Sequence, residues 1–345
     1  MFKKPLIAFL IITLFFVFVK NSLAYDDKTT HPALTQEIID FYNVYFFQKI
    51  TPEQKEWIIE GSILEDTVPR WINHFYDPVY QVGWTGEKAG NVSASLVNLF
   101  SKAILMVGQD PLSTVEWVNN PLVQKDYALY EGDRTWKKAL KYYTDGNEKE
   151  AYKTLGFVLH LLEDMAVPDH TRNDTHAPLE QATGDDGSPF EAYLTKYNRQ
   201  TIKDLNLPQN LSKQGQSPIT KQSVEEYLIS LAQYSNKYFF SKDTINDLKY
   251  QEPKIVRDDG EFGYGRDENG EEFALAKIFK GNYFLEKSDI SILNSYFSRL
   301  SRQAVLHGAG LIDLFFKQAR EAEENKNYPI HIIKVEIPSV PNISG

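Results

Sequence analysis

Residues 155–176 read LGFVLHLLEDMAVPDHTRNDTH, an apolar helical segment that runs into a loop carrying histidines. On a helix, His160 and Asp164 lie one turn apart on the same face, where both side chains can reach a single cation. A proline four residues after Asp164 ends the helix, so that His170 and His176 follow in the turn and can fold back toward the pair. The segment therefore predicts a buried helix that ends at a cluster of metal ligands.

A purely structural alternative exists for the same residues: a buried hydrogen bond between His160 and Asp164, followed by two ordinary loop histidines. The distribution of histidine favours the metal interpretation, because three of only seven histidines in the chain fall within residues 160–176. An imidazole and a carboxylate in such apolar surroundings are costly to bury unless they are paired or bound to a metal.

The composition restricts the chemistry of any such metal site. The chain has 345 residues, of which 42% are hydrophobic and 24% charged, a composition typical of globular proteins with a sizeable core. It contains no cysteine. A disulfide framework, a thiolate metal site, an iron–sulfur cluster and a cysteine nucleophile are therefore excluded, and any metal must be held by nitrogen and oxygen atoms.

The N-terminus predicts export from a bacterial cell. Lys3 and Lys4 precede an uncharged apolar run over residues 5–19, and the small residues Ser22 and Ala24 then stand at the two positions that select a cleavage site. The apolar run is shorter than the ~20 residues of a spanning helix, although an uncleaved anchor is the alternative. We therefore expect a signal peptide over residues 1–24 and a secreted or periplasmic mature protein.

The mature protein would be acidic. Removal of the signal peptide takes away three lysines and no acidic residue, which changes the formal charge from −10 to −13. Such a charge disfavours unspecific binding to nucleic-acid backbones, which depends on clustered Lys and Arg. It does not prevent binding of a single phosphate ester by metal ions, and no stable nucleic-acid complex is expected.

The rest of the chain predicts one all-α domain, over residues 25–326, with a small hairpin-like insertion and an extended C-terminal tail over residues 327–345. No internal repeat or long linker divides it. Glycine and Asp-Gly turn signals place the insertion at residues 254–284. Apolar periodicity predicts helices over residues 34–49, 53–64, 89–107, 133–144, 148–166, 188–205, 223–240 and 288–324, the last a central helix.

Two upstream segments offer further ligands. Asp66, with Glu65 as an alternative, precedes His74 in the run NHFYDP, residues 73–78. His31 precedes the first amphipathic helix and lies six residues after the predicted new N-terminus at Tyr25, whose α-amino group is itself a possible metal ligand.

Taken together, these motifs resemble the zinc-dependent phospholipase C family of bacteria and the fungal zinc-dependent single-strand nucleases that share its all-helical fold. The similarity runs from Tyr25 to about Glu191. Its first motifs are an N-terminal residue with a following histidine, and an acid before HFYDP. They are followed by a helix with Gly156, His160 and Asp164, and then by a Pro-x-His with a further histidine and acid.

The resemblance implies three zinc ions held by nitrogen and oxygen ligands. The first set is Asp66, His74, His160 and Asp164. The second is the α-amino and carbonyl groups of Tyr25, His31 and the bridging carboxylate of Asp164. The third is His170, His176 and an acid, for which Glu191 at the start of a helix is favoured over Glu180, four residues after His176.

By the same resemblance, the protein is expected to be a secreted phosphodiesterase that hydrolyses phospholipid headgroup esters with a hydroxide between two zinc ions, with Asp66 orienting the nucleophile. Phe75, Tyr76 and Tyr80 are candidates for headgroup contact or for the core, and Arg172 for phosphate contact or a surface pair with Asp174. The alternatives are a single-strand nuclease or nucleotidase and a non-catalytic zinc-binding protein. The protein is expected to be a monomer that contacts membrane surfaces only transiently.

Overall fold

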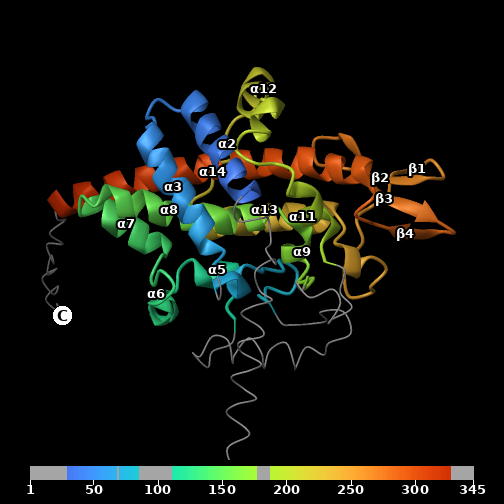
Figure 1. Ribbon diagram of the computed structural model, residues 1–345, viewed down its shortest axis with the longest axis horizontal. Helices are drawn as coiled ribbons and strands as arrows, with labels where there is room; N and C mark the ends of the chain where they lie inside the picture. The colour runs from blue at the N-terminus through green and yellow to red at the C-terminus, as the bar shows by residue number, and fades with distance from the viewer. Residues whose placement is uncertain (1–28, 68–69, 85–110, 177–186, 328–345) are drawn as a thin grey trace, which may run out of the picture.

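The computed structural model describes residues 29–67, 70–84, 111–176 and 187–327, and these form a mostly helical protein (Figure 1). The all-α class expected from the sequence is thus confirmed. The signal peptide over residues 1–24, Tyr25, Glu180 and the C-terminal tail after Asn327 lie outside the described residues, as does the helix expected over residues 89–107.

The longest element is α14 (Ile290–Asn327), which runs along the whole molecule in Figure 1. Its Tyr296, Leu300, Ala304, Ala309 and Phe315 are fully buried. The elements that pack against it include α2 (Thr30–Tyr45), α7 (Trp136–Thr144), α13 (Val224–Tyr238) and the sheet. The predicted role of this segment as a central helix is confirmed.

Two helices that end at the candidate site cross at unusually close range. They are α3 (Pro52–Glu65) and α8 (Glu148–Asp164). A Cβ added to Gly61 would lie 1.9 Å from the carbonyl oxygen of Lys153, and one added to Gly156 would lie 1.9 Å from that of Ile58. The two backbones are therefore in direct contact, which is possible only because both positions lack a side chain.

Short helices form the connections, several of them with proline in the first turn. One expectation is corrected here: the single helix predicted over residues 188–205 stops at Leu194. Asn198 Oδ1 accepts hydrogen bonds from the backbone N–H groups of Gln200 and Thr201, which stabilises a turn instead of a continued helix. The short elements are η2 (Arg70–Asn73), α5 (Thr114–Trp117), α6 (Pro121–Gln124), η3 (Lys125–Tyr127), α9 (Pro168–Thr171), α11 (Pro189–Leu194), η4 (Ile202–Leu205), α12 (Leu207–Lys213) and η5 (Lys242–Thr244).

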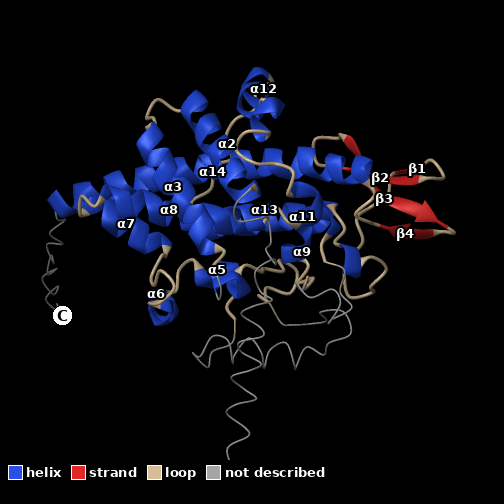
Figure 2. Cartoon of the chain, viewed as in Figure 1, coloured by secondary structure: helices blue, strands red, loops and turns tan. Residues whose placement is uncertain are grey.

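The predicted insertion is a four-stranded antiparallel sheet, more than a single hairpin, at one end of the molecule (Figure 2). Its strands are β1 (Arg257–Asp258), β2 (Phe262–Arg266), β3 (Glu272–Phe279) and β4 (Asn282–Phe284), in that order. Lys280 and Gly281 both have positive φ and close a two-residue turn between β3 and β4. Tyr296 of α14 donates its hydroxyl to the carbonyl oxygen of Leu275 at 2.6 Å, which fixes the sheet to the helical core.

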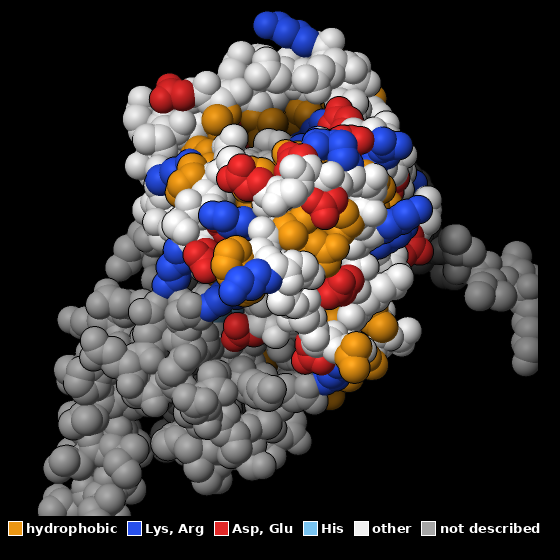
Figure 3. All heavy atoms as spheres, turned by 90° about the vertical axis from the view of Figure 1, so that its right-hand side faces the viewer, with side chains coloured by type: hydrophobic (Ala, Val, Ile, Leu, Met, Phe, Trp, Pro, Cys, Tyr) orange, Lys and Arg blue, Asp and Glu red, His pale blue; other side chains and the backbone are white. Residues whose placement is uncertain are grey.

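Figure 3 views this end of the molecule and shows Lys and Arg side chains interspersed with Asp and Glu, with apolar patches between them. Among the described helices, none is long and apolar enough to cross a membrane.

Candidate metal centre

Eight of the nine predicted metal ligands lie in the described residues, and all eight meet at one place beside the end of α8. His31 lies in the first turn of α2, and Asp66 directly follows α3. His160 and Asp164 project from the last turns of α8. The others come from the loop after η2, from α9 and the segment after it, and from α11: His74, His170, His176 and Glu191. Segments up to 160 residues apart therefore converge on one place.

The ligand atoms form three groups of three, and the atoms of each group lie within 4.8 Å of one another. The groups are His31, His160 and Asp164; Asp66, His74 and His160; and His170, His176 and Glu191. All members are buried except His176, whose side chain is 12% exposed.

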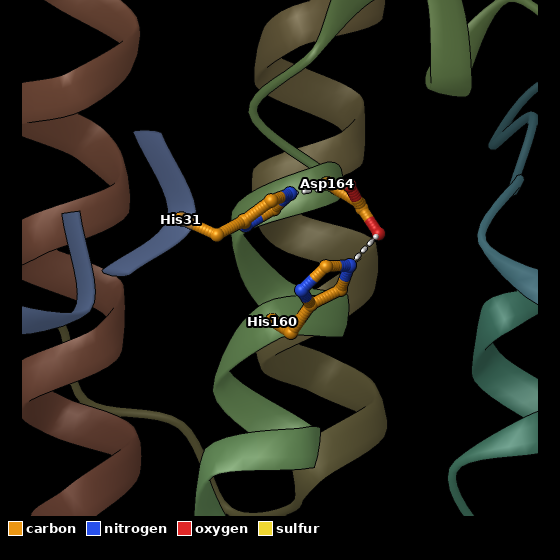
Figure 4. A group of neighbouring side chains, drawn as sticks. All are labelled: His31, His160 and Asp164. Atoms are coloured by element: carbon orange, nitrogen blue, oxygen red, sulfur yellow. Dashed lines mark ion pairs between the residues drawn. The ribbon is translucent and has the colours of Figure 1, made fainter. Parts of the chain in front are cut away.

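The carboxylate of Asp164 faces the rings of both His31 and His160 (Figure 4). Its Oδ2 lies 3.0 Å from His74 Nδ1 and 3.4 Å from His160 Nε2, whereas its Oδ1 lies 3.5 Å from His31 Nε2. Burial opposes ionisation of Asp164, but the surrounding histidines hold its pKa well below the usual range. The two oxygens of one ionised carboxylate thus face two different sets of histidines, which is the geometry of a bridging ligand.

The orientation of three histidines is fixed from outside by backbone carbonyl groups. The Nδ1 atoms of His160, His170 and His176 lie 2.7, 3.1 and 3.1 Å from the carbonyl oxygens of Ser62, His74 and Asp174. With the Nδ1 proton engaged in this way, each Nε2 is left as an acceptor that points to the acids. Metal-binding histidines in proteins are held in the same way.

Glu65, the alternative to Asp66, accepts hydrogen bonds from Arg70 and Trp117. Its Oε2 accepts hydrogen bonds from Arg70 Nε at 2.9 Å and Nη2 at 2.7 Å, and its Oε1 accepts one from Trp117 Nε1 at 2.8 Å. Oε1 also lies 3.4 Å from His74 Nε2, so that His74 presents Nδ1 to Asp164. Of the two consecutive acids, Asp66 is the one that joins a potential metal group.

The acid of the third group, Glu191, lies in the first turn of α11. Ser188 caps this helix by accepting the backbone N–H of Glu191 at 3.1 Å, with a proline in the first turn as expected. Glu191 lies 3.2 Å from His170 Nε2 and 3.0 Å from His176 Nε2. Burial opposes ionisation of Glu191, yet His176 and then His170 lower its pKa to about 2. The geometry thus supports the preference for Glu191, while Glu180 lies outside the described residues.

The donor set fits a borderline cation such as zinc. Several buried atoms make no hydrogen bond to any other described residue, namely His160 Nε2, His170 Nε2, Glu191 Oε1 and both carboxylate oxygens of Asp164. Leaving such atoms unsatisfied is expensive, and a cation would satisfy them together. Burial and the neighbouring His160 lower the pKa of His31 to about 3, so that its imidazole is neutral and available as a ligand.

Four other predicted residues lie outside these groups. Phe75 and Tyr76 are buried, and Phe75 stacks on His170 with ring centroids 4.6 Å apart, so both belong to the core. Tyr80 is 47% exposed and donates its hydroxyl to the carbonyl oxygen of Lys249. The expectation for Arg172 is corrected: it is fully buried and donates to the carbonyl oxygens of Asn236 and Gln251, so it is not a surface residue.

One residue at the site is not among the predicted ligands. Glu163 is fully buried, and its Oε2 lies 2.7 Å from His31 Nδ1. Burial raises its pKa well above the usual range. The sequence feature that could have identified Glu163 is its position as an acid at the end of an otherwise apolar helix, next to the predicted ligand Asp164.

No protein-family model matches this chain, and no curated protein sequence matches it. Solved structures that match include an alpha-toxin from Clostridium absonum, with a TM-score of 0.44, 13% identity, and coverage of 86% of this chain and 66% of the toxin chain. An alpha-toxin from an avian strain of Clostridium perfringens matches with a TM-score of 0.40, 13% identity, and coverage of 87% and 66%. This chain thus spans slightly less than two thirds of either toxin chain.

Proposed function

We propose that this chain is an exported, zinc-dependent phosphoric diester hydrolase of the phospholipase C type. The observation that carries the proposal is the position of Asp164, whose two oxygens face different histidines in a buried cluster of three potential metal groups. A structural His–Asp pair would need only one histidine. Eight ligand-type side chains that converge from four helices and the loops between them are better explained by several bound cations.

The proposed ligands follow the three groups. His74, His160, Asp66 and one oxygen of Asp164 would hold the first zinc ion. His31 and the other oxygen of Asp164 would contribute to the second, together with the predicted amino group of Tyr25. His170, His176 and Glu191 would hold the third. Zinc bound in this way would polarise a phosphoryl group and lower the pKa of a water molecule toward neutrality.

The side chains contribute charge, orientation and proton transfer. Ionised Asp164 and Glu191 offset the charge of the cations, and the carbonyl contacts of the histidines keep their Nε2 atoms directed inward. Asp66 lies at the edge of the cluster, with its Oδ1 3.9 Å from His74 Nδ1. From there it would orient the attacking water and accept its proton. Water adds to phosphorus, the bond to the leaving oxygen breaks, and a phosphomonoester and an alcohol result.

Three features favour a phospholipid substrate over a nucleic acid. The NHFYDP run resembles the phospholipase branch, and the formal charge of −10 opposes binding of a polyanion. The sheet end of the molecule also presents mixed charges instead of a basic surface (Figure 3). We therefore propose a headgroup ester as substrate, a transient contact with lipid surfaces and a monomeric protein.

The test is a parallel assay of the full chain after export and purification. Release of phosphorylated headgroup from phosphatidylcholine vesicles is measured beside cleavage of single-stranded DNA, each with chelator and after re-addition of zinc. We expect headgroup release that chelator abolishes and zinc restores. Cleavage of DNA alone would instead assign a nuclease, and neither activity in a zinc-loaded protein would refute the proposed enzyme.

A matched pair of variants controls this assay. His160→Ala removes a side chain shared by two metal groups and should abolish activity. His307→Ala removes a buried histidine that lies elsewhere, where it contacts Gln303 and Ser230, and should leave the zinc-dependent rate within a few-fold of that of the natural protein.

A further inference from the structure

The ring of His31 lies between two consecutive acids of α8. Glu163 Oε2 lies 2.7 Å from its Nδ1, and Asp164 Oδ1 lies 3.5 Å from its Nε2. All three side chains are fully buried. Successive residues of a helix point in directions about 100° apart. The end of α8 can therefore reach both nitrogen atoms of one imidazole with neighbouring side chains.

The two contacts differ in kind. The 2.7 Å distance is that of a strong hydrogen bond, in which Nδ1 donates to Glu163 Oε2 when His31 binds a metal through Nε2. Nε2 is then an acceptor that faces another acceptor, Asp164 Oδ1. Two acceptors at 3.5 Å are stabilised by a cation between them and destabilised without one.

Glu163 is itself held in place by its second oxygen. Thr35, one turn after His31 in α2, donates its hydroxyl to Glu163 Oε1 at 2.6 Å, and its oxygen also lies 2.9 Å from the Ser62 hydroxyl of α3. The backbone carbonyl of Ser62 contacts His160 Nδ1, and the rings of His31 and His160 stack with centroids 3.7 Å apart. The network thus joins α2, α3 and α8 behind two adjacent imidazoles.

We infer that Glu163 is a positioning residue for the zinc ion between His31 and Asp164: it accepts the Nδ1 proton of His31 and so directs Nε2 at the metal. This inference rests on the proposed zinc centre. It adds a role for a residue that belongs to none of the three metal groups. A carboxyl group offers an acceptor oxygen whether or not it is ionised, so the role does not depend on its protonation state.

The substitutions separate hydrogen bonding from packing. Glu163→Gln keeps an acceptor oxygen and nearly the same volume, whereas Glu163→Ala removes the acceptor. Glu148→Ala, at an exposed position in the first turn of the same helix, is the matched control. Zinc affinity of the full chain is measured by competition with a chelator of known affinity, and bound zinc is counted by mass spectrometry.

We expect Glu163→Ala to lower the affinity for one zinc ion by about 10- to 100-fold and to leave the affinity for the others unchanged. A loss of this size is usual when a hydrogen-bond partner of a metal ligand is removed. Glu163→Gln should restore affinity to within a few-fold, and Glu148→Ala should have no effect. Unchanged affinity in Glu163→Ala would overturn the inference. The inference would also be overturned if Glu163→Ala lowered the affinity for every zinc ion equally, or if Glu163→Ala and Glu163→Gln lowered the affinity by the same factor.

A second measurement distinguishes positioning from general stability. In a His31→Ala background, Glu163→Ala should leave the affinity of the remaining zinc ions unchanged, because its effect passes through His31. A further loss in that background would indicate a structural role and overturn the inference. Zinc counting needs no substrate: zinc binding without hydrolysis would refute the proposed enzyme alone, and hydrolysis with an unaffected Glu163→Ala would refute the inference alone.

Discussion

Replacement of Gly156 by alanine is a perturbation for which helix propensity and tertiary packing predict opposite results. Glycine inside a helix is less favourable than alanine by about 1 kcal/mol, so that propensity alone predicts stabilisation. In this structure, however, the new Cβ would lie 1.9 Å from Ile58 O and 2.9 Å from Ser62 N. Both atoms belong to the backbone of α3, and no side-chain rotation can relieve the contact.

The size of the effect follows from these distances. A Cβ makes ordinary van der Waals contact from 3.4 Å outward. The two helices would therefore have to separate by about 1.5 Å, in an interior packed as densely as a crystal. Overpacking of this kind costs about 1–3 kcal/mol, and we expect Gly156→Ala to lower the free energy of unfolding by about 2 kcal/mol.

The same displacement would reach the metal centre. His160 Nδ1 lies 2.7 Å from the Ser62 carbonyl oxygen across this helix contact, and Asp66 directly follows α3. A misplacement of about 1 Å can reduce a catalytic rate about 100-fold. Zinc affinity and hydrolysis should thus fall together with stability.

Urea unfolding followed by circular dichroism measures the first effect, and zinc counting measures the second. Lys149→Ala, an exposed change on α8, is the control and should stay within about 0.5 kcal/mol of the natural protein. If Gly156→Ala were as stable as the natural protein or more stable, the close contact between α3 and α8 would be wrong.

Three further predictions concern charge, pH and the N-terminus. Asp164→Ala should abolish hydrolysis and lose zinc, as measured by assay and metal analysis; full activity with full zinc would exclude a bridging role. Burial and then Asp40 raise the pKa of buried Glu37 from 4.5 to about 7, so ionisation costs stability as pH rises from 4.5 to 7. Denaturant titrations should show that Glu37→Gln gains up to about 3 kcal/mol over the natural protein between pH 4 and pH 8, and a pH-independent difference would contradict this pKa. A peptide tag before Tyr25 should abolish activity until it is cleaved off, and an active tagged protein would exclude the terminal amine as a ligand.

Much of the site could be predicted from local sequence because its spacing reflects helix geometry. His160 and Asp164 are four residues apart on one face of α8, and Pro168 begins the short helix α9, which carries His170. Ser188 and Pro189 mark the start of α11 and thereby place Glu191. Such features involve only residues close in the sequence, so they can be recognised without knowledge of the tertiary structure.

Other features depend on contacts that the sequence does not display. The choice between Glu65 and Asp66 is made by Arg70 and Trp117, which bind Glu65. Glu163 is recognisable only once α2 brings His31 beside it, 132 residues away along the chain. The end of α11 at Leu194 is likewise set by the turn around Asn198, which competes with the helical pattern of the following residues.

Anomalous X-ray diffraction at the zinc absorption edge, from crystals of the exported and purified protein, tests the central claim most directly. We predict three zinc peaks: one among His74, His160 and Asp66, one between His31 and Asp164, and one among His170, His176 and Glu191. Fewer than three peaks, or peaks away from these side chains, would contradict the assignment of the buried cluster as a trinuclear zinc centre.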